Sequence, residues 1–88
     1  MTARVSKEEV SRSVGVWLDN NEWAYKLVRG QLLKGIALKK TDPVKFALER
    51  SWYEIRDCVT FEGITVRKYA VREWLMAELD EIKFAQSK

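Results

Sequence analysis

Histidine is absent from this 88-residue chain, and cysteine and proline occur once each. Without histidine, the commonest general base, the Ser-His triad and the commonest zinc ligand are all missing. The single cysteine, Cys58, excludes an internal disulfide and a cage of several cysteines around a metal. No Gly-rich phosphate loop is present either. We therefore expect no catalytic residues, no metal and no cofactor in a protein that is not an enzyme and functions by binding.

Long apolar runs are also missing, and no early segment has the apolar core of a targeting signal. We expect no membrane contact and, with so little cysteine, a cytoplasmic (intracellular) location. Hydrophobic residues make up 47 % of the chain and charged residues 33 %, which is a globular composition. A chain of this length is expected to form a single domain over 1–88, with frayed ends at 1–5 and 85–88.

Positive charge is concentrated in the middle of the chain. Sixteen Lys and Arg against thirteen Asp and Glu give a net charge of +3, but residues 21–56 alone carry eight basic and four acidic groups. A net charge of this size is ordinary for a small domain. A localised basic zone, however, is the electrostatic pattern of proteins that bind the phosphate backbone of nucleic acids.

The spacing of apolar residues predicts four helices, over 6–19, 22–34, 43–56 and 69–84. The first begins with a capping box at Ser6 and Glu9, and the third with a capping Asp42 before Pro43 at the first helical position. Gly35 is the expected end of the second helix, with extended chain after it.

Between the third and fourth helices the apolar period changes from 3.6 to 2. A two-residue turn at 62–63 would place the apolar residues of both arms on one face and pair Val59 with Val66. Gly63 supplies the positive φ that such a turn needs. A hairpin over 58–67 is predicted, and the fold class is mainly α with a small β-hairpin, like a winged helix-turn-helix. An all-helical bundle with a loop at 58–67 is the alternative.

Four tryptophans occur, one in each predicted helix: Trp17, Trp23, Trp52 and Trp74. Each lies on an apolar stripe, and we expect a shared aromatic core. The alternative is that Trp23 is exposed for a partner.

The third helix carries the main candidate for binding. Phe46, Arg50 and Tyr53 form a stripe on the side opposite its apolar face, with Lys45 and Arg56 beside them. A helix that enters the major groove needs long donors on one face while the other packs on the core. The competing interpretation is that Phe46 and Tyr53 are buried, which would leave ordinary surface charge.

The second half of the chain resembles the excisionases, or recombination directionality factors, small winged-helix proteins of phages and mobile elements. Ala47, Trp52 and Arg56 in the third helix, a wing turning at Gly63, and Val71 and Trp74 in the last helix carry the resemblance. It implies an accessory protein that bends double-stranded DNA and steers an integrase or recombinase. It also implies major-groove contacts by the third helix and a contact by the wing. The candidate DNA-binding residues are Lys39, Lys40, Lys45, Phe46, Glu49, Arg50, Tyr53, Arg56, Thr65, Arg67 and Lys68.

Two other functions remain open. A non-enzymatic protein–protein interaction module, such as a phage-type inhibitor or adaptor, would explain the tryptophans and a last helix that presents Met76 or Phe84. Weak self-association through that helix would also fit. RNA binding is a third interpretation, because aromatic and basic residues in one stripe suit stacked bases.

Overall fold

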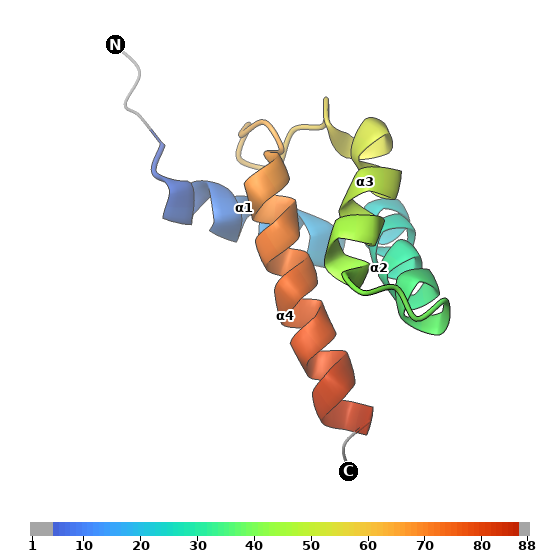
Figure 1. Cartoon of the computed structure of the whole chain (residues 1–88). Helices are drawn as coiled ribbons and strands as arrows, with labels where there is room; N and C mark the ends of the chain where they lie inside the picture. The colour runs from blue at the N-terminus through green and yellow to red at the C-terminus, as the bar shows by residue number, and fades with distance from the viewer. Residues whose placement is uncertain (1–4, 87–88) are drawn as a thin grey trace.

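Four helices account for most of residues 5–86, the part of the chain that the computed structural model describes. They are α1 (Lys7–Asn20), α2 (Glu22–Ala37), α3 (Pro43–Ile55) and α4 (Lys68–Gln86) (Figure 1). The predicted helix positions are correct to within a few residues. The ends predicted to fray at 1–4 and 87–88 lie outside the described residues, while Ala85 and Gln86 belong to α4.

The helix starts follow the capping signals of the sequence. The amide of Glu9 donates to Ser6 Oγ at 3.1 Å ahead of α1, and the amide of Lys45 donates to Asp42 Oδ1 at 3.0 Å ahead of α3. Each side chain satisfies one amide that the first turn of a helix leaves without a partner, which stabilises the helix by about 1 kcal/mol. Pro43 occupies the first helical position of α3, where its missing N–H costs nothing.

The expected end of the second helix at Gly35 is wrong. α2 continues to Ala37, and the chain leaves it through hydrogen bonds from the amide of Lys39 to Ile36 O and from the amide of Lys40 to Gly35 O, both 3.0 Å. This is the Schellman arrangement, and its left-handed position is taken by Lys39, with a φ of 57°, rather than by a glycine. Gly35 instead lies buried inside the helix, where α3 packs against it.

The predicted β-hairpin at 58–67 is also wrong, and with it the winged helix-turn-helix fold class. No strand or sheet forms among residues 5–86, where an isolated antiparallel bridge joins Val59 to Thr65. The described chain has the alternative architecture, an all-helical fold with a turn between α3 and α4.

The cause of this error is a shift of one residue in register. The amide of Thr60 donates to Ile64 O at 2.8 Å, and the amide of Gly63 donates to Thr60 O at 3.0 Å. The loop therefore has three residues, with Gly63 (φ 80°) in the left-handed position after a tight turn, rather than two. Because side chains alternate along an extended chain, the shift reverses which of them face the core on the first arm. Thr60 is buried, whereas Phe61 is 67 % exposed and Val59 is also exposed.

A buried hydroxyl pair fixes this register. Ser13 Oγ of α1 donates to Thr60 Oγ1 at 2.8 Å, and Thr60 Oγ1 also accepts from the amide of Ile64 at 3.1 Å. Leaving a buried hydroxyl without a partner costs about 1–3 kcal/mol, so the paired arrangement holds the turn against α1. Arg12 and Glu62 form a second link between the same segments at 3.9 Å.

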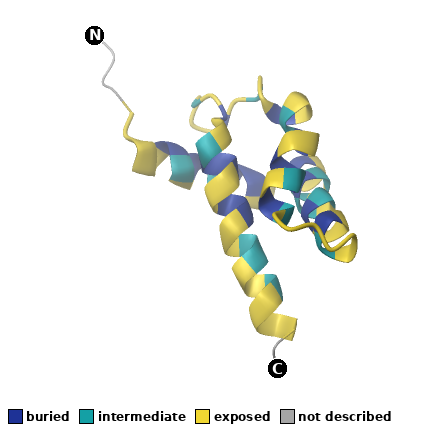
Figure 2. Ribbon diagram, viewed as in Figure 1, coloured by how far each residue is buried: buried dark blue, intermediate teal, exposed yellow. Residues whose placement is uncertain are grey.

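The core lies where the four helices meet (Figure 2). α3 packs against α2 and α4, and α1 packs against α4 and α2. The tryptophans do not form one shared core. Trp17 and Trp74 are buried, Trp52 is half-buried, and Trp23 is 50 % exposed with its ring edge-on to Trp17. The indole N–H of Trp74 donates to Asp19 Oδ1 at 2.9 Å, which joins α4 to the end of α1.

The C-terminal half of α4 extends beyond the other helices (Figure 1). Its fully buried residues end at Leu75, and the turns from Met76 to Gln86 are exposed except for Glu78, Leu79 and Ile82, which are half-buried.

Two glycines of α2 provide a test of this packing. A Cβ added at Gly30 would meet no atom within 4 Å, whereas one added at Gly35 would lie 2.9 Å from Phe46 Cδ1 and 3.3 Å from Pro43 Cβ. We expect Gly30→Ala to raise the free energy of unfolding by about 1 kcal/mol, the difference in helix propensity. Gly35→Ala should lower it by about 1–2 kcal/mol, because overpacking outweighs that gain. Urea denaturation measures both, and a gain in stability from Gly35→Ala would contradict the packing of α3 on α2.

Candidate nucleic-acid interface

One side of α3 is sealed in the core and the other is open to solvent. The buried side consists of Val44, Ala47, Leu48, Ser51 and Ile55. Ser51 is the polar member, and its hydroxyl donates to Ala47 O at 2.7 Å, so that no buried donor is left unpaired. The predicted site residues of α3 all lie away from this side, and Phe46 alone among them is half-buried.

Phe46, on the side of α3 that faces α2, has two cations over its ring. The Lys40 ammonium is 5.5 Å and the Arg50 guanidinium 5.1 Å from the centre of its ring. The ring itself packs against Gly35, whose missing side chain makes room for it. Cations over an aromatic face are attracted by its negative π-cloud, by about 0.5–1 kcal/mol at an exposed site. Phe46 therefore holds both charges at a defined place without neutralising them.

Arg50 has a second support. Its Nε donates to Gln31 Oε1 of α2 at 3.0 Å, and its two terminal amino groups make no hydrogen bond to any described residue. The guanidinium is thus held by the ring of Phe46 and by the hydrogen bond from its Nε to the Gln31 amide oxygen. Its outer edge, with two parallel groups of N–H donors, stays available for a ligand.

Two further cation–aromatic contacts lie toward the C-terminal end of α3. The Arg56 guanidinium is 4.9 Å from the ring centre of Tyr53, which is 75 % exposed. The Lys68 ammonium, at the start of α4, is 5.9 Å from the ring centre of Trp52. These contacts join with those around Phe46 in one surface, which we call the α3 face: Lys40, Lys45, Phe46, Glu49, Arg50, Trp52, Tyr53, Arg56 and Lys68.

Most of the positive charge of the α3 face is not neutralised. Among the described residues, the ion pairs are Arg12–Glu62, Lys26–Glu22, Arg29–Glu78 and Arg56–Asp57. Four of the five cations of the face therefore have no acidic partner within this part of the chain, and Arg56 has a loose one at 3.7 Å. Glu49 is the one acid within the face, and three exposed acids border it: Asp42, whose carboxylate keeps its charge while it caps α3, Glu54 and Asp57. The result is a cationic surface interleaved with aromatic rings.

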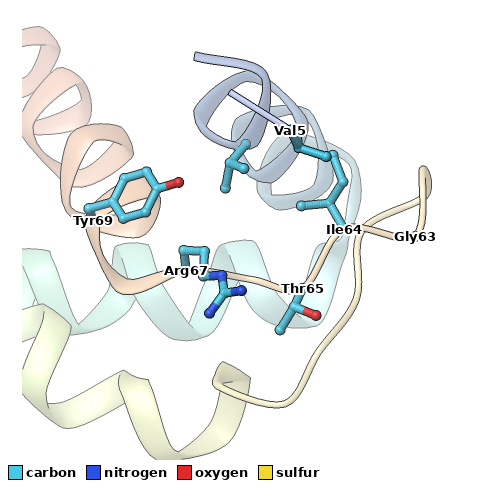
Figure 3. Close-up of a pocket in the computed structure, with 7 residues that line it drawn as sticks. Val5, Gly63, Ile64, Thr65, Arg67 and Tyr69 are labelled. Carbon is cyan, nitrogen blue, oxygen red and sulfur yellow. The ribbon is translucent and has the colours of Figure 1, made fainter. Parts of the chain in front are cut away.

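The predicted contacts Thr65 and Arg67 do not join this surface. They line a pocket of about 390 Å³ between the start of α1, the 58–67 turn and the start of α4. Figure 3 shows Arg67 and Tyr69 on one side of this pocket and the turn on the other, with Val5 from the α1 side. Lys39, also predicted, is exposed at the end of α2, beside the α3 face.

Three residues of the site were missed by the sequence prediction. Gln31 and Gly35 belong to α2, and no local pattern shows that they contact α3. The apolar spacing predicts Trp52 in the core, but it lies at the edge of the apolar side of α3, where Lys68 covers its ring. The i, i+4 spacing of Phe46 and Arg50, by contrast, was visible in the sequence and predicts their contact.

No feature of the described residues indicates catalysis at this surface. Burial, and to a lesser degree the Asp57 carboxylate, raise the pKa of the Cys58 thiol, which keeps it in the unreactive protonated form. Within residues 5–86 there is no cluster of three or more Cys, Asp or Glu side chains placed to hold a metal ion. None of the helices in that range combines the length and apolar composition needed to cross a bilayer.

The chain matches no protein-family model, and searches of curated proteins and of solved structures return no match. The resemblance to excisionases stays a prediction, and the hairpin wing on which it partly rested is not formed.

The cation–aromatic contacts can be checked in solution by NMR. Protons that lie over an aromatic ring are shifted upfield by its ring current. We expect upfield shifts for the ε-methylene protons of Lys40 and the δ-methylene protons of Arg50, and we expect Phe46→Leu to remove both. Lys45, which contacts no ring, is the control. Random-coil shifts for Lys40 and Arg50 in the unsubstituted protein would show that neither cation rests on Phe46.

Proposed function

We propose that this protein binds double-stranded DNA through the α3 face, with α3 in the major groove. The observation that carries the proposal is the fixed position of Arg50, whose outer donors project from the exposed side of a helix that is packed on its other side. A helix held in this way by its own core is the element with which many small domains read base edges.

Arg50 suits the reading of a guanine. Recognition of that base uses two parallel N–H donors directed at O6 and N7, and Arg50 offers its terminal amino groups while Nε is held by Gln31. Because the guanidinium is already positioned, little rotamer entropy is lost when it binds. Glu49, one residue earlier on the exposed side of α3, supplies an acceptor of the kind that pairs with cytosine N4.

The remaining cations flank α3 on both sides, as a contact with two phosphate strands requires. Lys40 lies toward α2, over the ring of Phe46, and Lys68 lies toward α4, over Trp52. Phosphate contacts of this kind fix register and orientation, while base contacts give specificity. Lys40, Lys45, Arg56 and Lys68 are assigned to phosphates.

The proposal describes a non-catalytic DNA-binding accessory or regulatory protein, and it implies an intracellular location. An integrase or recombinase as protein partner follows from the excisionase resemblance alone. Without a hairpin wing, the proposed contacts outside α3 come from the end of α2 and the start of α4.

Binding to short duplexes, followed by fluorescence anisotropy, tests the proposal. With four cations on phosphates, the logarithm of the affinity should fall with the logarithm of salt concentration with a slope of about −3 to −4. A duplex selected from a random pool should bind tighter than unrelated sequence. Arg50→Ala should reduce that preference about 10- to 100-fold, whereas Lys45→Ala should weaken binding to all duplexes alike.

Arg12→Ala is the matched control, because Arg12 lies on α1, which does not pack against α3, and pairs with Glu62. It should change neither the preference nor the general affinity beyond a small long-range effect. Absence of duplex binding at tens of micromolar protein in low salt would refute the proposal. Tighter binding to single-stranded RNA than to any duplex would instead favour RNA binding, in which the aromatic rings of the α3 face stack on bases.

A further inference from the structure

The pocket of about 390 Å³ beside the 58–67 turn has an apolar wall and a polar wall (Figure 3). Val5 and Val10 from the α1 side and Ile64 from the turn form the apolar wall. Val5 and Val10 flank the Ser6 cap at the two positions of a hydrophobic staple, where apolar side chains fix how the chain enters a helix. The volume lies at the lower end of the range for ligand pockets, about 300–1,000 Å³, so the pocket suits a small group. We call it the α1–turn pocket.

The polar wall consists of Thr65, Arg67 and Tyr69. Thr65 and Arg67 alternate with Val66, which is 1 % exposed, so both point away from the core. The amide of Val66 donates to Cys58 O at 3.0 Å and holds this stretch of backbone in place. Tyr69 is half-buried in the first turn of α4, and Figure 3 shows its hydroxyl directed into the pocket. The three polar side chains are therefore presented from a defined backbone.

None of these three side chains makes a hydrogen bond or an ion pair with any residue between 5 and 86. The Arg67 guanidinium offers N–H donors in a planar fork and has no acceptor, while the Thr65 and Tyr69 hydroxyls each offer one O–H donor. A set of donors without internal partners, gathered on one side of an apolar pocket, is what fixes the orientation of a bound ligand.

The charge at the α1–turn pocket is positive. Arg67 lines it, and the Lys7 ammonium is 5.5 Å from the ring centre of Tyr69. The flanking acids, Glu9 and Glu62, are not part of the lining, and Glu62 faces Arg12 at 3.9 Å. A ligand that matches both walls carries negative charge at one end and an apolar group at the other.

We propose that the α1–turn pocket binds a carboxylate carried on a short aliphatic group. The planar fork of Arg67 matches the two oxygens of a carboxylate, and the hydroxyls of Thr65 and Tyr69 donate to the same oxygens. The aliphatic group lies against the apolar wall. A free carboxylic acid and the C-terminal residue of a peptide both have this chemistry. The inference does not depend on the DNA-binding proposal, because no residue of the α3 face lines the pocket.

NMR titration of the full chain with isocaproate tests the proposal. Signals of residues 63–69 and the methyl groups of Val5 and Val10 should shift saturably, with a dissociation constant of about 1 mM or tighter. Isocaproamide, which has a similar shape without the charge, should bind at least about tenfold more weakly. Arg67→Gln should weaken isocaproate binding by at least about tenfold for the same reason. Tyr69→Phe should weaken it about two- to tenfold, because one hydrogen bond is lost.

Lys34→Gln is the matched control, since it removes one positive charge from an exposed position of α2, which does not line the pocket. It should leave the affinity for isocaproate unchanged, and circular dichroism checks that each variant is folded. Acetyl-Ala-Ala-Leu with a free C-terminus separates the two sources of the carboxylate. Tighter binding of this peptide than of isocaproate supports a chain end as the ligand, and weaker binding supports a free acid.

Three results would overturn the proposal. The first is the absence of saturable shifts at about 20 mM isocaproate, well above the expected dissociation constant. The second is equal weakening by Arg67→Gln and Lys34→Gln, which would indicate a response to net charge alone. The third is tighter binding of inorganic phosphate than of isocaproate at the same signals, since the apolar wall would then contribute nothing.

Discussion

The close packing of α3 on α2 is the constraint on which the binding surface depends. Gly35 has no side chain, and its place is taken by the ring of Phe46, which brings α3 against the second half of α2. That contact turns the apolar side of α3 into the core and its polar side to solvent. It also brings Gln31 of α2 within hydrogen-bond distance of Arg50. A bulkier residue at position 35 would separate the helices and take Gln31 out of reach of Arg50.

Aromatic side chains have two separate tasks in this small domain. Trp17 and Trp74 are buried and join helices, whereas Phe46, Trp52 and Tyr53 lie at or near the surface under cations. A cation paired with a carboxylate loses much of its attraction for phosphate, but a cation on a ring keeps its full charge. Holding cations by rings rather than by acids therefore combines a defined geometry with a strong positive field. This combination is what the α3 face offers to a polyanion.

Structural features that depend on neighbouring residues could be predicted from the sequence. Features that depend on contacts between residues far apart in the sequence could not. Helix starts at Ser6 and Asp42 follow from local caps, and the outward direction of Arg50 follows from helical period. The 58–67 turn could not be predicted, because its register is decided by Thr60 meeting Ser13, which is 47 residues away in sequence. Glycine is the usual residue at a helix end, so the sequence predicts that end at Gly35, whereas Lys39 takes the left-handed position. The support of Arg50 by Gln31 also has no local signal.

The central claim, that the α3 face binds DNA, is tested most directly by mapping amide chemical shifts during titration with a duplex at low salt. The account predicts that shifts concentrate in residues 43–56, with Lys40 and Lys68, and leave the first turns of α1 unchanged. Perturbations confined to other surfaces, or none at all, would contradict it.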